Sequence, residues 1–171
     1  PTFYARFDSS DSPDQERCPN NLLHFGEEFW RWSTFDNWPD LGLQNSPANA
    51  GGFLDIDDDG DLDVFIVNDK PQQGYLSGVL ENQGDRRLVK IDDRGTDVAT
   101  QGMGLAWGDV NLDGHLDFAI TGWSEIKLLL NDGSDHWYEA ALASGLVADI
   151  QRVVGWGIEM TDLDNDGDED V

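Results

Sequence analysis

The chain has 171 residues, of which 39 % are hydrophobic, and its seven Trp and eight Phe are enough to build the core of one ordinary domain. Its 35 acidic and 10 basic residues give a formal net charge of −25. This acidity argues against nucleic-acid binding through a basic surface and against docking on an anionic membrane. No apolar run approaches the roughly 20 residues that a membrane-spanning helix needs.

The N-terminal 20 residues stand apart from the rest. Residues 2–7 have the composition of a short strand, and residues 8–20 form a loop rich in Ser, Asp and Pro. Two interpretations remain open: a strand paired within this domain, or an arm that completes a sheet elsewhere in this chain or in a neighbour. Cys18 is the only cysteine, so its thiol is either buried and inert or paired with another chain.

From residue 21 the chain repeats a unit of about 50 residues, anchored on Gly60, Gly114 and Gly167. We divide it into three units, residues 21–70, 75–123 and 124–171. Each unit predicts four short strands separated by turn residues, with at most one or two helical turns at residues 140–146. A repeat of this length with four strands is typical of a β-propeller blade.

The four predicted strands of each unit occupy corresponding positions. The first strands are residues 22–24, 78–82 and 126–130, and the second strands are residues 29–32, 87–91 and 136–138. The third strands are residues 52–54, 104–107 and 155–160, and the fourth strands are residues 62–67, 116–121 and 169 onward. Glycines at or just before the third strands indicate close backbone packing near a propeller axis.

The third unit reaches Val171 just as its fourth strand begins. Three blades do not close a propeller, which takes roughly four to eight. We therefore expect an all-β fold of about three four-stranded blades that belongs to a larger propeller or is completed by another chain, which would also cover the open sheet edges.

A nine-residue acidic loop separates the third and fourth strands of every unit. We name these loops loop 1 (residues 55–63), loop 2 (residues 109–117) and loop 3 (residues 162–170), and number their positions 1 to 9. They align as Asp-x-Asp/Asn-x-Asp-Gly-x-x-Asp and hold 15 of the 35 acidic residues. Side chains at positions 1, 3 and 5 converge, the glycine at position 6 permits a sharp turn, and the carbonyl of position 7 points inward, as in the first half of an EF-hand.

The candidate metal ligands are the residues at positions 1, 3, 5, 7 and 9: Asp55, Asp57, Asp59, Asp61, Asp63, Asp109, Asn111, Asp113, His115, Asp117, Asp162, Asp164, Asp166, Asp168 and Asp170. All-oxygen ligand sets favour Ca²⁺, with Mg²⁺ or Mn²⁺ as alternatives, and there is no Cys/His set for zinc. Clustered carboxylates repel one another, so metal-free turns are disfavoured. We expect about three Ca²⁺ sites, each tying the third strand to the fourth.

The three loops and their spacing resemble FG-GAP/VCBS repeats, as found in integrin α-subunit propellers and in bacterial proteins similar to cartilage acidic protein. The resemblance covers residues 22–171. Because the literal Phe-Gly and Gly-Ala-Pro signatures are not evident, the closer match is to the VCBS-type branch. The resemblance implies a calcium-bearing β-propeller outside the cytoplasm, used in adhesion or recognition, and it identifies no ligand because such propellers carry many functions.

We therefore expect an extracellular or cell-surface protein with a structural or adhesive role, whose partner is a second copy, another extracellular protein or a glycan. Self-assembly into a larger fibre or surface structure is one form of this role. No catalytic residues are predicted, because no Ser/His/Asp signature or phosphate-binding glycine loop is present. His24, His115 and His136 are not spaced as a metal-binding triad. We expect no enzyme activity.

Two alternative functions remain open. Tryptophans that could stack on sugars indicate a carbohydrate-binding module: Trp30, Trp32, Trp38 and Trp123. Trp107 and Trp156 lie in predicted third strands and are expected in the core, because large aromatics supply much of the burial in small sheets. The second alternative is a fragment of a propeller-type polysaccharide-active enzyme whose site lies on other blades.

Overall fold

The computed structural model describes residues 47–84, 87–147 and 153–171. The predicted N-terminal arm and the first two predicted strands of the first unit lie outside these ranges. The strands are β1 (Ala48–Leu54), β2 (Asp63–Asn68), β3 (Gly78–Asn82), β4 (Leu88–Lys90), β5 (Gly102–Gly108), β6 (Asp117–Gly122), β7 (Ile126–Asn131) and β8 (Trp137–Glu139). The eight strands coincide closely with those predicted in residues 52–138.

Helices are minor in the described residues. The 3₁₀ turn η3 (Pro71–Gln73) links β2 to β3, and the α-helix α1 (Ala141–Ser144) follows β8. The prediction of one or two helical turns at residues 140–146 is confirmed by α1. Within the described ranges, no helix has the length and apolar character required to cross a membrane.

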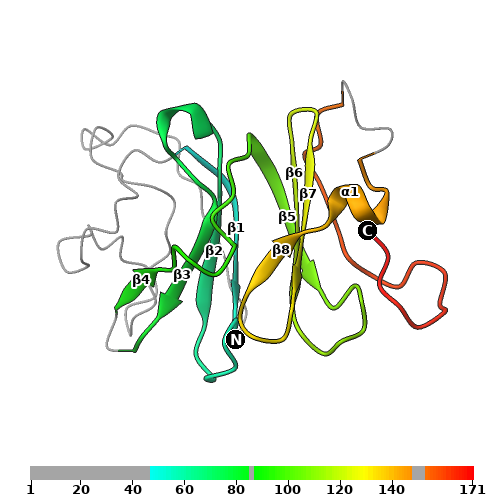
Figure 1. The fold of residues 1–171 in the computed structure, drawn as a ribbon, viewed down its shortest axis with the longest axis horizontal. Helices are drawn as coiled ribbons and strands as arrows, with labels where there is room; N and C mark the ends of the chain where they lie inside the picture. Colours follow the sequence, from blue (N-terminus) through cyan, green and yellow to red (C-terminus); the bar gives the residue numbers. More distant parts are fainter. Residues whose placement is uncertain (1–46, 85–86, 148–152) are drawn as a thin grey trace, which may run out of the picture.

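The strands form two four-stranded antiparallel sheets, in the order β1-β2-β3-β4 and β5-β6-β7-β8 (Figure 1). Each strand pairs with its neighbour in sequence, as short turns between antiparallel strands allow. The all-β prediction is therefore confirmed. The first strands of the two sheets, β1 and β5, also contact each other, so the sheets lie side by side along these two strands.

The predicted units do not coincide with the sheets. As boundaries between sheets, the predicted unit boundaries are therefore wrong. The unit predicted at residues 75–123 joins β3 and β4 of the first sheet to β5 and β6 of the second. The repeat fixes the period of about 50 residues but not the strand at which a sheet begins. The β2–β3 pairing, from Val64↔Leu80 to Ile66↔Gly78, decides the phase. Each sheet therefore begins with the hairpin that carries the acidic loop.

The third unit keeps its first two predicted strands, as β7 and β8, and departs from the third and fourth. Residues 155–160 form no strand, and the isolated bridges in the described residues from 153 on are Trp123↔Val154 and Thr161↔Asp170. A strand needs a neighbour that continues its ladder, and among the described residues the pairing with the segment after loop 3 is limited to the Thr161↔Asp170 bridge. The segment still packs against the second sheet through Met160, which is buried.

The core between the two sheets is aromatic. Phe65 of β2 and Phe118 of β6 face each other with ring centroids 4.7 Å apart, and Trp137 of β8 lies 5.7 Å beyond Phe118. All three side chains are fully buried. Trp137 also donates from its indole Nε1 to the Leu116 carbonyl at 2.8 Å, which satisfies the polar atom that a buried tryptophan carries.

The prediction that Trp107 and Trp156 lie in the core is wrong. Trp107 is 40 % exposed and Trp156 is 68 % exposed. The ring of Trp107 instead covers the backbone of Gly52 in the neighbouring sheet, where a Cβ would lie 2.5 Å from its Cζ3 atom. At Gly104, a Cβ would lie 2.4 Å from the Trp156 carbonyl oxygen. At both positions the absence of a Cβ permits close contact between successive repeats.

Each sheet is apolar on both faces. The second sheet packs one face on the first sheet and the other on α1 and the segment around Met160. The first sheet has a further buried cluster, built around Val64 and Leu80, on the face directed away from the second sheet. Sheets that bury both faces are suited to stacking in series.

Candidate metal centres

The three acidic loops lie at corresponding places in the fold. Loop 1 connects β1 to β2, loop 2 connects β5 to β6, and loop 3 lies between the bridged residues Thr161 and Asp170. Figure 1 shows the hairpin ends that carry loops 1 and 2 on the same side of the two sheets. In each case the loop joins two adjacent antiparallel strands or bridge residues, so the ends of the loop are held a few ångströms apart.

The loops share one backbone conformation. The residue at position 4 has a positive φ in all three, at 60° for Asp58, 59° for Leu112 and 63° for Asn165. The glycine at position 6 has φ of 92°, 89° and 99° in loops 1, 2 and 3. Glycine adopts such angles without a Cβ clash, which explains its place at position 6. The two left-handed residues, at positions 4 and 6, curl the chain around the centre of the loop.

Side-chain oxygens at positions 1, 3 and 5 cap the backbone of that curl. The amide of position 6 donates to the aspartate of position 1 at 3.0, 2.8 and 3.1 Å in loops 1, 2 and 3. The amide of position 5 donates to position 3, and that of position 7 donates to position 5. Short Asp and Asn side chains stabilise turns in this way, and the result directs carboxylates towards the centre of the loop.

Position 9 ties the loop to the sheet. Asp63 and Asp117 are fully buried. Each accepts from the amide of position 2 through Oδ2 and from the next strand through Oδ1, where the donors are Asn82 at 2.7 Å and Asn131 at 2.8 Å. Asp170 accepts from position 2 of loop 3 at 3.0 Å. The closing aspartate therefore fixes the loop against β3 in the first sheet and β7 in the second.

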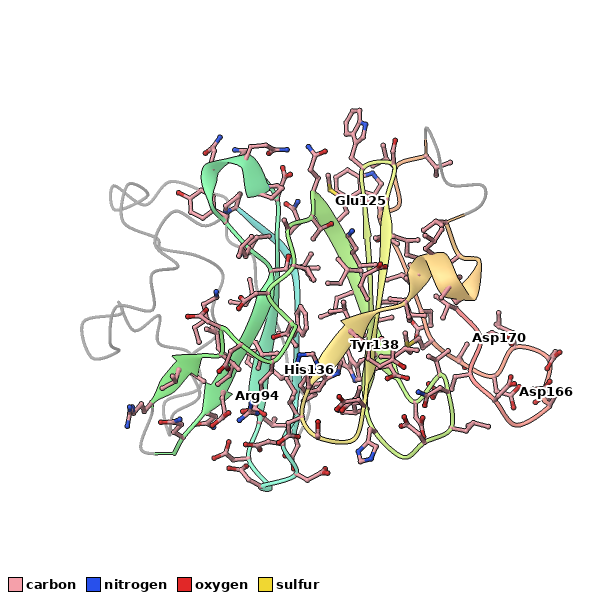
Figure 2. All side chains as sticks on the ribbon, in the orientation of Figure 1. Arg94, Glu125, His136, Tyr138, Asp166 and Asp170 are labelled. Atoms are coloured by element: carbon pink, nitrogen blue, oxygen red, sulfur yellow. The ribbon has the colours of Figure 1, made fainter. Side chains whose placement is uncertain are left out.

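The structure gathers six of the predicted ligands into two groups. Within each group one carboxylate oxygen per residue lies within 4.8 Å of the others, and the groups are Asp55, Asp57 and Asp63 in loop 1, and Asp162, Asp164 and Asp166 in loop 3. Figure 2 shows Asp166 and Asp170 on the projecting third loop. Positions 1, 3 and 5 converge in loop 3 as predicted, whereas in loop 1 position 9 joins positions 1 and 3 in place of position 5.

Loop 2 has fewer carboxylates because position 3 is Asn111. Its amide nitrogen donates to Asp113 at 2.9 Å, and its carbonyl oxygen accepts from the Asp113 backbone. Asp109 accepts from the amides of positions 5 and 6, as the aspartate of position 1 does in loop 3. Loop 2 thus keeps the shared geometry with a lower negative charge.

The predicted ligands at positions 5 and 7 are less uniform. Asp59 is exposed and caps the amide of Asp61. Asp61 is half-buried, whereas His115 and Asp168 are exposed. The His115 ring lies against the β7–β8 turn, where a Cβ on Gly133 would approach its Nε2 to 3.0 Å. Neither carboxylate group includes a side chain of position 7, where the predicted ligand is the backbone carbonyl oxygen.

Within loop 1, and likewise within loop 2, the neighbouring carboxylates repel one another. Burial raises the pKa of Asp57, and the neighbouring charges of Asp59, Glu81 and Asp55 raise it further, against one backbone hydrogen bond that lowers it. Burial also raises the pKa of Asp63 and of Asp117, against two backbone hydrogen bonds at each carboxylate. Desolvation and like charge both disfavour the ionised form, so a cation among these carboxylates would be stabilising.

Two carboxylate oxygens of loop 1 support this fit. Asp55 Oδ1 and Asp61 Oδ1 are buried, and neither has a hydrogen-bond partner. A buried carboxylate oxygen without a partner is costly, and coordination by an oxygen-seeking cation is one way to satisfy it. The donor set around them contains only oxygen, which suits a hard cation such as Ca²⁺.

Sequence reasoning missed the partners that the loops find on neighbouring strands. Asn82 and Asn131 follow the ends of the hydrophobic runs in β3 and β7, and each accepts from the amide two residues on, at Gly84 and Gly133. The shared Asn-x-Gly pattern was a detectable turn signal. Its link to position 9 depends on pairing between strands and is not visible in the local sequence.

A second polar region lies where the two sheets meet. It is an open groove of about 690 Å³ lined by six residues: Asp93, Arg94, Asp132, Ser134, Asp135 and His136. Figure 2 shows Arg94 and His136 on facing segments of the two sheets. Arg94 lies 3.3 Å from Glu81 of β3 and 4.0 Å from Asp135 of the second sheet. This ion-pair set connects the sheets close to loop 1.

Comparison with known proteins identifies the repeat. A protein-family model described as an FG-GAP-like repeat matches residues 55–120 and residues 109–171. The two matches start at position 1 of loops 1 and 2 and together span more than half of the chain. A search of curated proteins found no match.

Proposed function

Because the chain belongs to the FG-GAP-like repeat family, we propose that its repeats are blades of an extracellular, calcium-stabilised β-propeller with a structural or adhesive role. The observation that carries the calcium proposal is the convergence of Asp55, Asp57 and Asp63 within 4.8 Å beside the unpartnered Oδ1 atoms of Asp55 and Asp61. Those residues would hold the ion in loop 1. The ion would supply the positive charge that links the ends of β1 and β2.

The propeller proposal is supported by the way in which the sheets stack. Both are four-stranded meanders, each buries apolar side chains on two faces, and β1 and β5 contact each other through glycine-rich backbone. A register shift at Asn49 in β1 recurs at Met103 in β5. Repeated sheets that pack face to face through their first strands are arranged as propeller blades are.

The family and the chemistry of the loops support the proposed location and role. FG-GAP repeats are typically extracellular domains, and extracellular calcium is abundant enough to fill sites with Kd values as weak as roughly 10⁻⁴ to 10⁻³ M. The expected role is binding rather than catalysis. The expected partner is a second copy or another extracellular protein.

Thermal unfolding tests the calcium proposal. The chain is stripped with EDTA, and its midpoint is compared before and after Ca²⁺ is restored, with Mg²⁺ at the same concentration as the control. Each filled site is expected to stabilise the folded chain by roughly 3–4 kcal/mol when calcium is at a hundred to a thousand times Kd. An unchanged midpoint after exhaustive chelation would contradict a structural role for calcium.

Light scattering tests the self-association part of the role. A calcium-loaded chain that forms dimers or larger species, and a chelated chain that does not, would support adhesion between copies. A strictly monomeric chain under both conditions would remove self-association and leave another extracellular protein as the partner.

Glycan binding is a second candidate function, supported by exposed tryptophans. Trp123 is 59 % exposed and Trp156 is 68 % exposed, and the Trp123↔Val154 bridge holds the two chain segments together. Exposed aromatic faces can stack on sugars. A glycan array would be screened with the native chain and with Trp123→Ala and Trp156→Ala. Tyr138→Ala, at an exposed aromatic on β8, is the matched control. Glycan binding that survives both Trp substitutions, or no glycan bound at all, would count against this candidate.

A further inference from the structure

Glu81 is a carboxylate outside the loops that lies beside loop 1. It precedes Asn82, whose amide donates to Asp63 at position 9 and whose side-chain nitrogen lies 3.3 Å from the carbonyl oxygen of position 8. The Glu81 side chain is 15 % exposed, and its Oε2 atom is buried without a hydrogen bond. β3 therefore places a largely buried carboxylate next to the end of the acidic loop.

Strand register places Glu81 beside loop 1. In the β2–β3 ladder Val64 pairs with Leu80, so the next residues along the two strands, Asp63 at position 9 of loop 1 and Glu81, lie across from each other. Arg94 lies 3.3 Å from Glu81 Oε2, at the edge of the groove between the sheets. This contact is an ion pair without an aligned hydrogen bond, so Arg94 offsets part of the Glu81 charge.

The second sheet lacks this carboxylate. Asn82 and Asn131 make the same bond to position 9 of their loops, so the residues before them, Glu81 and Leu130, occupy equivalent places. Leu130 packs on the apolar cluster beyond the second sheet. Leu130 is explained by apolar packing, whereas Glu81 places a charged group at this position, with Arg94 as its ion-pair partner.

We propose that Glu81 is an affinity-determining residue of the first calcium site, supplied by β3 from outside the loop, and that it makes loop 1 bind calcium more tightly than loop 2. This inference rests on the proposed calcium sites. The affinity of a calcium loop rises with the number of charged groups around it. Loop 1 has six acidic residues and loop 2 has three. Glu81 therefore adds to a difference in negative charge that already exists between the two loops.

The experiment measures calcium binding at each loop separately in the full chain. The amides of Gly60, Gly114 and Gly167 each donate to the aspartate at position 1 of their loop. Their nitrogen–proton resonances in a two-dimensional NMR spectrum therefore report loops 1, 2 and 3 during a calcium titration. The native chain is compared with Glu81→Gln, which keeps the size and removes the charge, and with Glu81→Asp, which keeps the charge.

Glu125→Gln is the matched charge control. Glu125 accepts from the Gln101 amide and the Thr100 hydroxyl, and Figure 2 places it at the end of the second sheet opposite the loops. Glutamine keeps an acceptor oxygen for these bonds. The control removes one negative charge from the chain at a site remote from loop 1.

The inference predicts that Glu81→Gln raises the calcium midpoint at Gly60 roughly tenfold, because one unit charge near a divalent ion contributes about 1 kcal/mol even in a water-like dielectric. Glu81→Asp retains most of the affinity, and Glu125→Gln shifts the midpoint less than about twofold. An unchanged Gly60 midpoint in Glu81→Gln, or equal shifts at all three glycines, overturns the inference. If no glycine resonance of the native chain responds to calcium, the proposed calcium sites are themselves contradicted.

Discussion

Loops 1 and 2 share a backbone conformation and its hydrogen bonds, and they differ in negative charge. Both curl through a left-handed residue at position 4 and a glycine at position 6, and both close on a buried aspartate that accepts two backbone amides. Loop 1 gathers three carboxylates, and its Asp55 Oδ1 and Asp61 Oδ1 atoms are buried without a hydrogen-bond partner. Loop 2 has Asn111 where loop 1 has Asp57 and His115 where loop 1 has Asp61.

The comparison separates two roles within one motif. The residues that the loops share build the turn through hydrogen bonds that need no ion. The residues that differ set the negative charge and hence the expected calcium affinity. A loop of this kind can therefore keep its fold while its affinity for calcium changes.

The largest expected effect is a loss of stability when the buried aspartate at position 9, which both loops share, is removed. Asp63→Ala and Asp117→Ala each remove a buried acceptor and leave two backbone amides without a partner, at a cost of about 3 kcal/mol in the free energy of unfolding. Urea denaturation in EDTA measures this cost without calcium. Similar losses in the two variants are expected. A loss below about 1 kcal/mol in either would contradict the role of position 9 in fixing the loop.

Adding a carboxylate to loop 2 tests whether the residues that differ between the two loops set the calcium affinity. Asn111→Asp gives loop 2 the carboxylate that loop 1 has at position 3, and we expect its calcium midpoint, read at the Gly114 amide, to fall roughly tenfold. Glu125→Gln is again the control, because it changes one charge at the end of the second sheet opposite the loops. That variant should leave the Gly114 midpoint within about twofold.

The pH dependence of the chelated chain tests the electrostatics. Burial raises the pKa of Asp63 and Asp117 above 3.8 in the folded chain. The folded chain then binds these protons more tightly than the unfolded chain. This contribution to stability is fully present below pH 3.8 and is lost as the pH rises through the raised pKa values. In EDTA, lowering the pH from 7 towards 4 should therefore raise the contribution of these two groups to the free energy of unfolding.

Two exposed groups oppose this trend weakly. Hydrogen bonding lowers the pKa of Asp132 and of Asp166, so their contributions are lost as the pH falls, but solvent screens them. Asp63→Asn and Asp117→Asn remove the titrating groups and should flatten the profile. A profile that is the same in native and variant chains would contradict the sign derived from burial.

The smallest expected effect concerns Arg94. Arg94→Gln removes a cation beside Glu81, so the Gly60 calcium midpoint should fall about threefold while Gly114 stays unchanged. The ion pairs to Glu81 and Asp135 are partly exposed, at 3.3 and 4.0 Å. Their loss should therefore cost less than about 1 kcal/mol of stability. A weaker calcium response at Gly60 would contradict the proposed sign of the Arg94 charge.

Much of the local structure could be predicted from the sequence. Strands such as Gly78–Asn82 follow apolar runs between turn residues, and the curl of each loop follows from Asp and Gly at fixed spacing. These features depend on interactions between residues close in the chain. The convergence of positions 1 and 3 in loop 1 was predictable for the same reason.

Features that depend on pairing between distant residues could not be predicted. The phase of the sheets was wrong because it depends on β2 pairing with β3. The exposure of Trp107 was wrong because its ring covers Gly52 of the other sheet. Glu81 was missed because its place beside loop 1 depends on strand register rather than on any motif.

Calorimetric titration of calcium into the EDTA-stripped, buffer-exchanged native chain is the decisive test of the calcium sites. We expect saturable binding of about three ions per chain, one for each acidic loop, with loop 1 filled before loop 2. No heat of binding at millimolar calcium, together with an unchanged NMR spectrum, would contradict the assignment of these loops as calcium sites.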